Sequence, residues 1–412
     1  MNNKNRIIYL LGVFFIALII RIIFIHTLNN KINVWGDWWS GLGWQLATGK
    51  GFWVANPFFH KGPVFYAWRD PGFPFFLSII YRIFGHNYLA AKIGLAVLSS
   101  LSAVLLYFTG KILANERVGI ISSLIYVFYP AAIFWTGFHA QETLVIPILL
   151  DFSLCFLSGE KFKNSYMFFF AGVFLGLGVL TFSLFLVILP VIFIYILIKN
   201  KRLFIKGFLI PLVSCFLVVS PWIMRNYKIY KIFLLTSTEG GIVAYIANNH
   251  LSISQPTGYW NPPVGYFQKL KGYSEIKIDR YLYFKTLSFI KKHPKIYLSL
   301  VGERIIRFWR FYPHTFSGPG KSNYYKKYVL ASLFTIGLLL LVSFWGIILS
   351  FIKNRWKDFL LLYLLIFAWS APLILFFKVV IRYREPIMPY MIIFASLVIN
   401  QLLDRKKKYV EK

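Results

Sequence analysis

Acidic side chains are scarce in this sequence, which makes the position of each one informative about chemistry. The chain has 14 Asp and Glu residues against 45 Lys and Arg residues. Asp37 lies among tryptophans in the segment Val34-Trp35-Gly36-Asp37-Trp38-Trp39. A carboxylate that aromatic rings partly desolvate has a raised pKa and becomes a better base. Asp37 is therefore a candidate general base, and a solvated loop aspartate beside an interfacial aromatic belt is the alternative.

Glu142 is the second candidate carboxylate. It follows His139 in the segment 137–143 and begins an apolar run. The helix dipole favours a carboxylate in the first turn of a helix, so a purely structural role is the alternative to a catalytic one. Asp151 lies inside the same run, where an ion pair with a neighbouring helix explains it as well as a functional role does.

Basic residues among Gly and Pro form a third group. His60 and Lys61 lie in one such stretch, and Arg69 and Asp70 lie in another, the segment 68–74. Cations in loops of this kind are suited to binding a phosphate. The alternative is that they are cations at a helix end that extend their side chains to reach water.

Three further arginines belong with these cations. Arg382 and Arg384 stand directly before the last apolar run, and Arg21 lies in the outer part of the first run, from which it could reach the same pocket. None of these residues is a specific signal alone. The sequence holds no nucleophile-elbow, zincin or P-loop spacing.

Long apolar runs account for the composition. Hydrophobic residues make up 58% of the chain and charged residues only 14%, against about 25% charged in soluble domains. A membrane-spanning helix needs about 20 mostly apolar residues, and the sequence predicts about ten such helices. The predicted spans are 7–28, 88–108, 117–136, 142–158, 165–182, 183–199, 207–224, 327–352, 358–377 and 386–403.

The basic residues between these spans predict the topology. With the N-terminus in the cytoplasm, every short cytoplasmic loop carries Lys or Arg, as does the tail from Arg405 to Lys408. Ten spans then put both termini in the cytoplasm and leave five segments outside: 29–87, the turn 136–141, the turn near Phe182, 225–326 and 378–385. We expect an all-α, multi-pass protein of the inner or plasma membrane with a layer of loops on its outer face.

The external segments contain two shorter predicted helices. The apolar stretch from Phe73 to Phe84 is too short to span and indicates an interfacial helix, and a second helix is expected around Asp279 to Lys292. The predicted parts are 1–224, an N-terminal transmembrane catalytic module with the first external loop 29–87; 225–326, an external loop region; and 327–412, the C-terminal transmembrane helices.

The formal net charge of +31 does not indicate nucleic acid as a partner. The basic residues stand mainly in the gaps between apolar runs, where anionic lipid headgroups are their natural neighbours, and no zinc-finger or RNA-binding motif is present. Cys155 and Cys215 both lie inside apolar runs, so the sequence indicates no disulfide framework.

In their order along the chain, these segments resemble the polyprenol-dependent glycosyltransferases of the GT-C superfamily. The resemblance is to glycosyltransferase family 39, which includes protein O-mannosyltransferases and the aminoarabinose transferases acting on lipid A. The sequence differs from those of the protein O-mannosyltransferases in having a single Asp in the first loop and no large lumenal domain. The matching segments are Arg21, Asp37, Leu46 to Phe52, Arg69 to Leu77, Tyr81 to Gly85, Tyr129-Pro130, Glu142, Ser220 to Tyr227 with Arg225, Gly240-Gly241, Asn248-Asn249 and Arg382 to Pro386.

The resemblance implies a GT-C-type helical bundle and a sugar donor carried on a polyprenyl phosphate. Asp37 would be the general base on an acceptor hydroxyl, which attacks the anomeric carbon with inversion, and Glu142 would orient the acceptor or share a divalent metal ion with Asp37. Whether a metal ion is present stays open, because two carboxylates alone supply few of the ligands that a divalent metal ion needs. Lys61, Arg69, Arg382 and Arg384 would bind the donor phosphate, with Arg21, His60, Asp70, His139, Arg225 and Asn249 as further pocket residues.

Other functions fit the same topology. An O-antigen polymerase or ligase also uses polyprenyl-linked sugars, but its functional arginines surround a large late loop without a first-loop Asp. A lipid or glycan transporter is expected to show related halves with interrupted helices, and this sequence shows no such repeat. The expected partners are therefore the donor lipid, the bilayer, and a glycan, lipid or protein acceptor.

Overall fold

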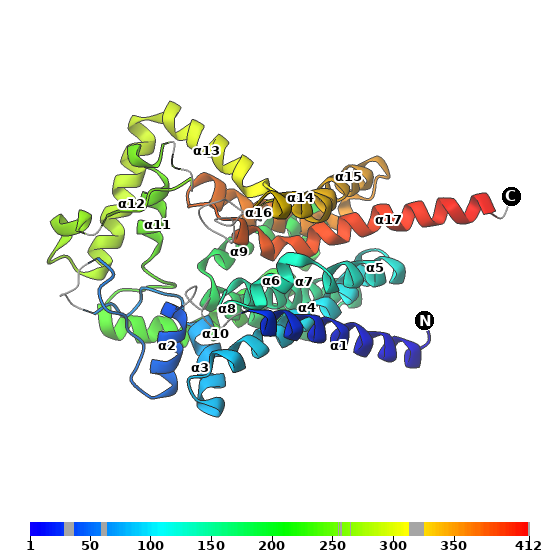
Figure 1. Ribbon diagram of the computed structural model, residues 1–412, viewed down its shortest axis with the longest axis horizontal. Helices are drawn as coiled ribbons and strands as arrows, with labels where there is room; N and C mark the ends of the chain where they lie inside the picture. The colour runs from blue at the N-terminus through cyan, green and yellow to red at the C-terminus, as the bar shows by residue number, and fades with distance from the viewer. Residues whose placement is uncertain are drawn as a thin grey trace.

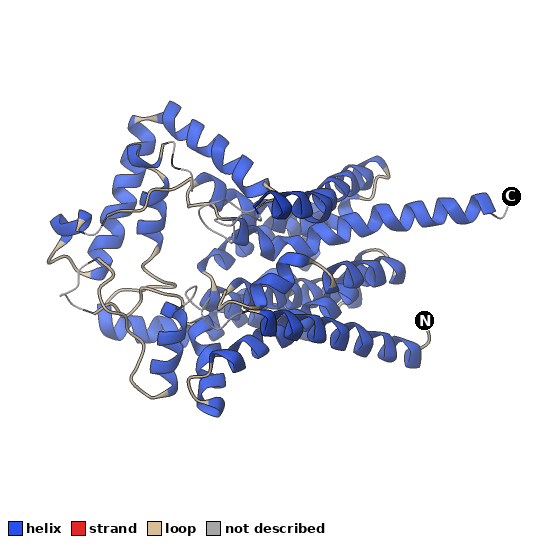
Figure 2. Ribbon diagram, viewed as in Figure 1, coloured by secondary structure: helices blue, strands red, loops and turns tan. Residues whose placement is uncertain are grey.

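The computed structural model describes residues 1–28, 37–58, 64–253, 255, 258–263, 265–312 and 325–410, although the side chains of 37, 325–328 and 405–410 lie outside the description. Within these residues the chain is helical and forms no strand, as Figure 2 shows. A single isolated bridge pairs Val54 with Phe65 in the first external loop. The prediction of an all-α protein is confirmed.

Each predicted span corresponds to one or two helices of the structure. Seven helices are long and apolar enough to cross a membrane, and a bent pair makes an eighth; these counts refer to the described residues. The helices that cover the predicted spans are α1 (Asn3–Thr27), α4 (Tyr88–Leu113), α5 (Glu116–Val127) with α6 (Pro130–Thr136), α7 (Glu142–Phe162), α8 (Ser165–Thr181), α9 (Ile188–Lys199), α10 (Ile210–Tyr230), α14 (Tyr325–Ser332) with α15 (Leu338–Ile352), α16 (Leu360–Leu375) and α17 (Met388–Val410).

The predicted span 117–136 is not one helix. It breaks after Val127, and α5 and α6 meet at a bend of 50°. Pro130 is the first residue of α6, where a helix tolerates proline because that N–H needs no partner. Proline also disfavours helical backbone in the residue before it, and Tyr129 is accordingly extended.

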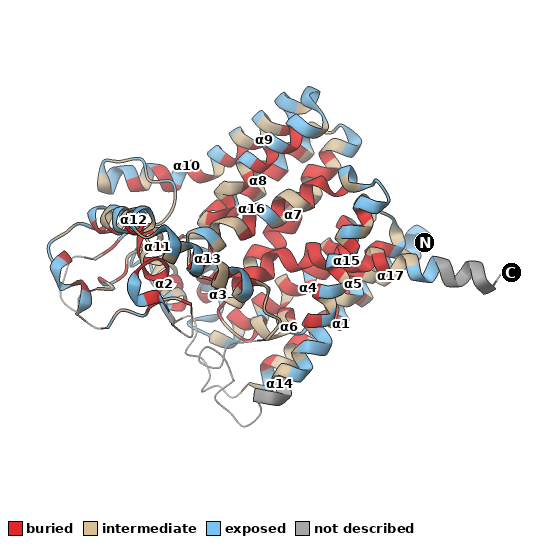
Figure 3. Ribbon diagram, turned by 90° about the horizontal axis from the view of Figure 1, so that it is seen from above, coloured by how far each residue is buried: buried red, intermediate tan, exposed pale blue. Residues whose placement is uncertain are grey.

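The bundle packs around α4, α7, α8 and α17, where the buried residues gather in Figure 3. Small residues bring some helix pairs close together. A Cβ added at Gly346 of α15 would lie 2.0 Å from the Phe394 carbonyl oxygen of α17. Serines of neighbouring helices also bond across the core, as Ser122 Oγ does to Ser396 Oγ at 2.9 Å.

A layer of shorter helices covers one end of the bundle (Figure 1). Aromatic residues of the first external loop, including Phe65 and Trp68, pack against Ile278 and Leu282 of this layer in a core of their own. The interfacial helix and the helix near 279–292 that the sequence predicts are both present. The layer contains α2 (Asp37–Ala47), α3 (Gly72–Phe84), α11 (Gly240–Ala247), α12 (Glu275–Lys292) and α13 (Pro294–Trp309).

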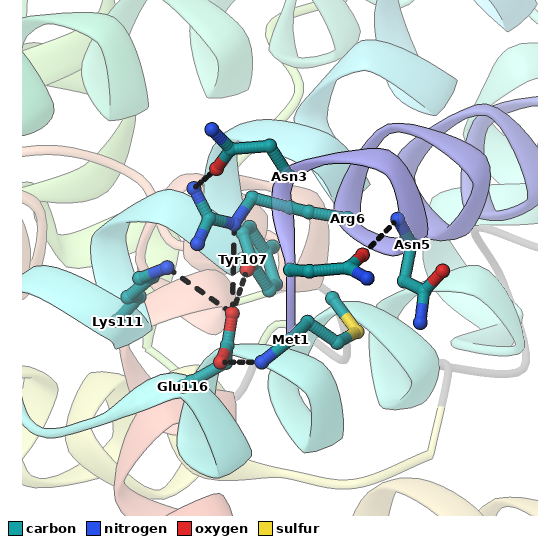
Figure 4. Close-up of polar contacts among 8 residues, drawn as sticks. Met1, Asn3, Asn5, Arg6, Tyr107, Lys111 and Glu116 are labelled. Carbon is teal, nitrogen blue, oxygen red and sulfur yellow. Dashed lines mark hydrogen bonds and ion pairs between the residues drawn. The ribbon is translucent and has the colours of Figure 1, made fainter.

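Both termini lie at the opposite end of the bundle from this layer (Figure 1). There the Glu116 carboxylate accepts a hydrogen bond from Tyr107 at 2.8 Å and pairs with Lys111 at 3.1 Å and Arg6 at 3.6 Å. The amino group of Met1 pairs with the same carboxylate at 2.8 Å, and Figure 4 shows these groups converging on it. This cluster joins the first turns of α1 to α4 and α5.

The close approach of α15 to α17 yields a prediction about stability. Gly346→Ala should destabilise the protein by about 1–3 kcal/mol, because the new methyl group would overlap backbone atoms of α17. The measurement is thermal unfolding of the purified protein in detergent. Gly12→Ala in α1 is the matched control, because a Cβ there has no neighbour within 4 Å. Equal melting temperatures for the two variants would contradict the close packing.

Candidate functional site

The buried Glu142 forms an ion pair with the partly exposed Arg382 at the end of the bundle that carries the outer layer. Glu142 is the first residue of α7, and Arg382 lies in the 3-10 helix η10 (Ile381–Ile387) that leads into α17. The Arg382 Nε is 3.2 Å from the Glu142 Oε1, and Glu142 is only 2% exposed. The structure thus brings together two residues that the sequence analysis named separately.

The Glu142 carboxylate has unused capacity for hydrogen bonds. Neither of its oxygens accepts one from the described residues, although both are buried. A buried acceptor without a donor typically costs about 1–3 kcal/mol. Such a group points to a donor on a bound molecule, and an acceptor hydroxyl has the required O–H.

Lys378 adds a second cation to this pair. It acts electrostatically on Glu142, and its Nζ lies 5.1 Å from the centre of the Tyr259 ring. Two cations beside one carboxylate leave a surplus of positive charge, which suits an anionic ligand. Lys378 was not among the predicted site residues, although it lies in the same external segment, 378–385, as Arg382.

Arg384 and Glu385 lie beneath this pair and are almost fully buried. The Arg384 Nη1 donates to the carbonyl oxygens of Phe308 at 3.1 Å and Arg310 at 2.8 Å, which fixes the end of α13. The Glu385 carboxylate accepts a hydrogen bond from the Tyr129 hydroxyl at 2.9 Å. These contacts give Arg384 a structural role, and its predicted role in donor binding stays a prediction.

Arg69 is likewise engaged with the protein. Its guanidinium pairs with Glu239 and lies over the ring of Trp39, with Cζ 5.0 Å from the ring centre. Trp39 belongs to the first turn of α2, the helix that begins with Asp37. Arg69 therefore holds the helix that carries the candidate base, and a donor phosphate would have to compete with Glu239 for it.

Asp70 connects three external segments. Its carboxylate accepts hydrogen bonds from the Ser183 amide at 2.9 Å, the Ser183 hydroxyl at 2.7 Å and the Ser237 amide at 3.1 Å. Burial raises the pKa of Asp70 to about 6, although these hydrogen bonds oppose the shift. The backbone at Gly72 packs closely against α8, where a Cβ on residue 72 would lie 2.9 Å from the Leu180 backbone.

A chain of stacked rings runs from α2 to the start of α7. Trp44 of α2 stacks on His86 with 5.2 Å between ring centres, His86 contacts Tyr88 at 5.1 Å, and Tyr88 stacks on His139 at 5.3 Å. His139 stands three residues before Glu142. Desolvation lowers the pKa of His139 to about 4, so the ring is neutral at neutral pH.

The ring chain connects the helix of Asp37 with the helix of Glu142. It supports the idea that both carboxylates serve one site. The Asp37 side chain and the residues His60 and Lys61 lie outside the described part of the chain. Their predicted roles as base, pocket residue and phosphate ligand stay predictions.

Three other predicted pocket residues have structural contacts. The fully buried Arg21 donates to Ser99 at 2.8 Å and to backbone carbonyls of α1 and α5, and no described contact joins it to Glu142 or Arg382. Arg225 donates to the carbonyl oxygens of Tyr66 at 2.6 Å and Phe52 at 2.8 Å, which ties the first external loop to α10. The Asn249 Oδ1 accepts a hydrogen bond from the Leu251 amide, and its Nδ2 donates to the Tyr245 carbonyl oxygen of α11.

Two residues that the sequence analysis did not name hold the outer layer. The Glu275 carboxylate accepts hydrogen bonds from the Tyr66 amide at 2.8 Å and the Ala67 amide at 3.1 Å. The buried Arg304 donates to the carbonyl oxygens of Ala247 at 2.7 Å and Leu375 at 3.0 Å. Only their unusual burial identifies them, and the sequence gives no sign of it.

The described residues offer no metal cluster. No group of three or more His, Cys, Asp or Glu side chains converges among them. The nearest charged partner of Glu142 is a guanidinium, which would repel a metal cation. The Asp37 side chain lies outside the described residues, so a metal ion shared by Asp37 and Glu142 stays a prediction.

Comparison with known proteins supports the fold. A family model described as dolichyl-phosphate-mannose-protein mannosyltransferase matches residues 68–224, which include Arg69, Asp70 and Glu142. No curated protein sequence matches the chain.

Two solved structures resemble nearly the whole chain. The oligosaccharyltransferase AglB from Archaeoglobus fulgidus, in complex with an inhibitory peptide and a dolichol-phosphate, is 14% identical with a TM-score of 0.61, over 98% of this chain and 51% of that one. ArnT from Cupriavidus metallidurans, bound to undecaprenyl phosphate, is 11% identical with a TM-score of 0.57, over 97% of this chain and 60% of that one. This chain therefore spans about half to three-fifths of their lengths. The predicted GT-C-type bundle is confirmed.

Asp70 and His139 should affect the pH dependence of stability in opposite directions. The folded protein raises the pKa of Asp70 from 3.8 to about 6, so stability from this group falls as pH rises through that window. The folded protein lowers the pKa of His139 from 6.5 to about 4, so stability from this group rises with pH there. Asp70→Asn should make the pH slope of the melting temperature more positive, and His139→Gln should make it less positive.

The measurement is thermal unfolding of both variants and the wild-type protein between pH 4 and 7. Each shift corresponds to about 3 kcal/mol, which is a readily detected change. Slopes that change in the same direction would contradict the assignment of one buried acid and one buried neutral imidazole.

Proposed function

We propose that this protein is a membrane glycosyltransferase that moves a sugar from a polyprenyl phosphate donor to an acceptor on the outer face. One observation carries the proposal. The chain shares its fold with two proteins, one solved with a dolichol-phosphate and the other with undecaprenyl phosphate. At the layered end of this fold, the chain places the buried Glu142 beside Arg382 and Lys378. A carboxylate with unused acceptors and a surplus of cations is the combination that this transfer needs.

The cations serve the leaving group. A sugar linked to a polyprenyl phosphate is a phosphodiester with one negative charge, and the polyprenyl phosphate that departs gains a second. Arg382 and Lys378 would be positioned where this charge develops, so they stabilise the transition state more than the bound donor. Arg69, Arg384 and Lys61 remain further candidates for contacts to the phosphate.

The carboxylates serve the acceptor. Its hydroxyl oxygen forms a bond to the anomeric carbon while the bond from that carbon to the phosphate oxygen breaks, and attack from the opposite face inverts the configuration. Asp37 takes the hydroxyl proton, and Glu142 accepts a hydrogen bond that orients the acceptor. The acceptor is a cell-envelope glycan, a lipid or a protein, and the protein acts in the inner or plasma membrane with both termini in the cytoplasm.

The cations beside Glu142 can be tested by donor binding. Arg382→Gln and Lys378→Gln should each weaken binding of a polyprenyl phosphate by about 10- to 100-fold, since a hydrogen bond to a charged group contributes about 1.5–3 kcal/mol. Binding is measured on purified protein in detergent. Arg280→Gln is the matched control, because Arg280 is an exposed arginine of the outer layer.

Arg382→Gln also leaves Glu142 without its partner, so the double variant E142Q/R382Q must be measured as well. If the double variant regains donor affinity, the loss in the single variant came from the uncompensated carboxylate. Unchanged affinity in both single variants would remove these cations from the donor site.

Asp37→Asn tests the base. Asparagine keeps the shape of the side chain but cannot accept the proton, and general base assistance is typically worth about 10²–10⁴-fold. Turnover with a polyprenyl phosphate sugar should fall by that order while donor affinity and melting temperature stay near the wild-type values. Asp404→Asn, an exposed carboxylate of α17, is the control.

The competing explanation is that Asp37 only anchors its loop among Trp35, Trp38 and Trp39. An asparagine can still accept a hydrogen bond, so the variant would then keep most of its activity. Turnover within a few-fold of the wild-type rate would remove Asp37 from the mechanism.

A further inference from the structure

The end of the bundle opposite the outer layer contains a cavity. Its volume is about 370 Å³, within the roughly 300–1,000 Å³ of typical small-molecule sites. One of its lining residues, Glu160, stands in the last turn of α7, roughly 27 Å along the helix from Glu142. The cavity is therefore separate from the proposed active site. Its lining residues are Ile112, Leu113, Leu157, Glu160, Lys161, Lys199 and Asp358.

A fixed polar network forms one wall of the cavity. The Glu160 Oε2 accepts hydrogen bonds from the Tyr195 hydroxyl at 2.5 Å and from the Lys199 Nζ at 3.2 Å. The Lys199 Nζ also donates to the Tyr195 hydroxyl at 2.7 Å. These contacts use two of the three N–H donors of Lys199 and leave the Glu160 Oε1 as an acceptor on the cavity wall.

Charges of both signs surround the remaining space. Asp358 pairs with Arg355 through Oδ2 at 2.9 Å, which leaves its Oδ1 as a second acceptor, and Lys161 is exposed. Lys111 precedes two apolar lining residues but is already paired with Glu116 (Figure 4). The cavity thus combines two cations with two carboxylates and a small apolar side, where Ile112 is partly exposed and Leu113 and Leu157 are buried.

Helix polarity strengthens the negative part of this field. The helices α4, α7 and α9 all end beside the cavity, at Leu113, Phe162 and Lys199. The C-terminal carbonyl groups of helices carry partial negative charge and favour a cation. A ligand that matches the cavity therefore has an N–H-bearing cation, a separate anion and an adjoining apolar portion.

We propose that this cavity binds the headgroup of a zwitterionic aminophospholipid, phosphatidylethanolamine. Its phosphate contacts Lys161 and Lys199, its ammonium donates to Glu160 and Asp358, and its glycerol lies beside the partly exposed Ile112, with the acyl chains continuing into the bilayer. The quaternary ammonium of phosphatidylcholine has no N–H to donate, and phosphatidylglycerol has no cation. This site lies at a bilayer interface whichever face of the membrane the termini occupy.

The test uses the full-length protein in nanodiscs of phosphatidylcholine, phosphatidylethanolamine and phosphatidylglycerol in equal amounts, followed by native mass spectrometry of the released protein. The wild-type protein should retain phosphatidylethanolamine over the other two lipids. Lys161→Ala and Asp358→Asn should each reduce this retention by about tenfold, the factor that corresponds to 1.4 kcal/mol. Both residues are exposed, so neither variant should disturb folding.

Lys206→Ala and Asp404→Asn are matched controls, since both residues are exposed and neither lines the cavity. They should retain the lipid as the wild-type protein does. Equal retention of the three lipids, a preference for phosphatidylglycerol, or unchanged retention in the two cavity variants would each overturn the proposal.

A soluble arm distinguishes the lipid from a free headgroup. Phosphoethanolamine is added to the delipidated protein in detergent, and its binding is compared with that of phosphatidylethanolamine. It should bind at least tenfold more weakly, because it lacks the acyl chains, whose burial in the surrounding detergent is favourable. Equal affinity would overturn the assignment of a lipid to the cavity.

Discussion

The ion pair between Glu142 and Arg382 is the contact on which the candidate site depends. It joins the start of α7 to the segment before α17, so it fixes the two halves of the chain against each other beneath the outer layer. Removing one partner of a buried ion pair typically destabilises a protein by about 3–5 kcal/mol. The pair therefore both holds the bundle and sets the charge of the site, and a ligand must adapt to that charge.

Charged side chains that bind backbone groups join parts of the outer layer to one another and to the bundle. Asp70 and Glu275 accept from backbone amides, while Arg225 and Arg304 donate to backbone carbonyls. A contact of this kind fixes the path of a loop, because a backbone group cannot rotate away as a side chain can. The same layer contains α2, the helix that begins with Asp37.

Hydropathy predicts the spans of this fold well, because a helix in a bilayer must be apolar over its whole length. It does not predict the break before Pro130, since a proline in an apolar run occurs in continuous helices too, as at Pro147 of α7. The sequence also does not predict which residues the charged side chains pair with. Arg69 and Glu239 are both readable as solvated loop residues, and only the fold brings them into contact.

The contacts of the arginines separate structural cations from functional ones. Arg21, Arg225 and Arg304 give their donors mainly to backbone carbonyls, which cannot be withdrawn without unfolding a helix end or a loop. Arg382 faces a carboxylate whose oxygens still lack hydrogen bonds. A guanidinium in that position can share its charge with an incoming phosphate while the carboxylate turns to a hydroxyl. Partner chemistry, more than position on the outer side, therefore favours Arg382 and Lys378 as the cations that we propose for the donor phosphate.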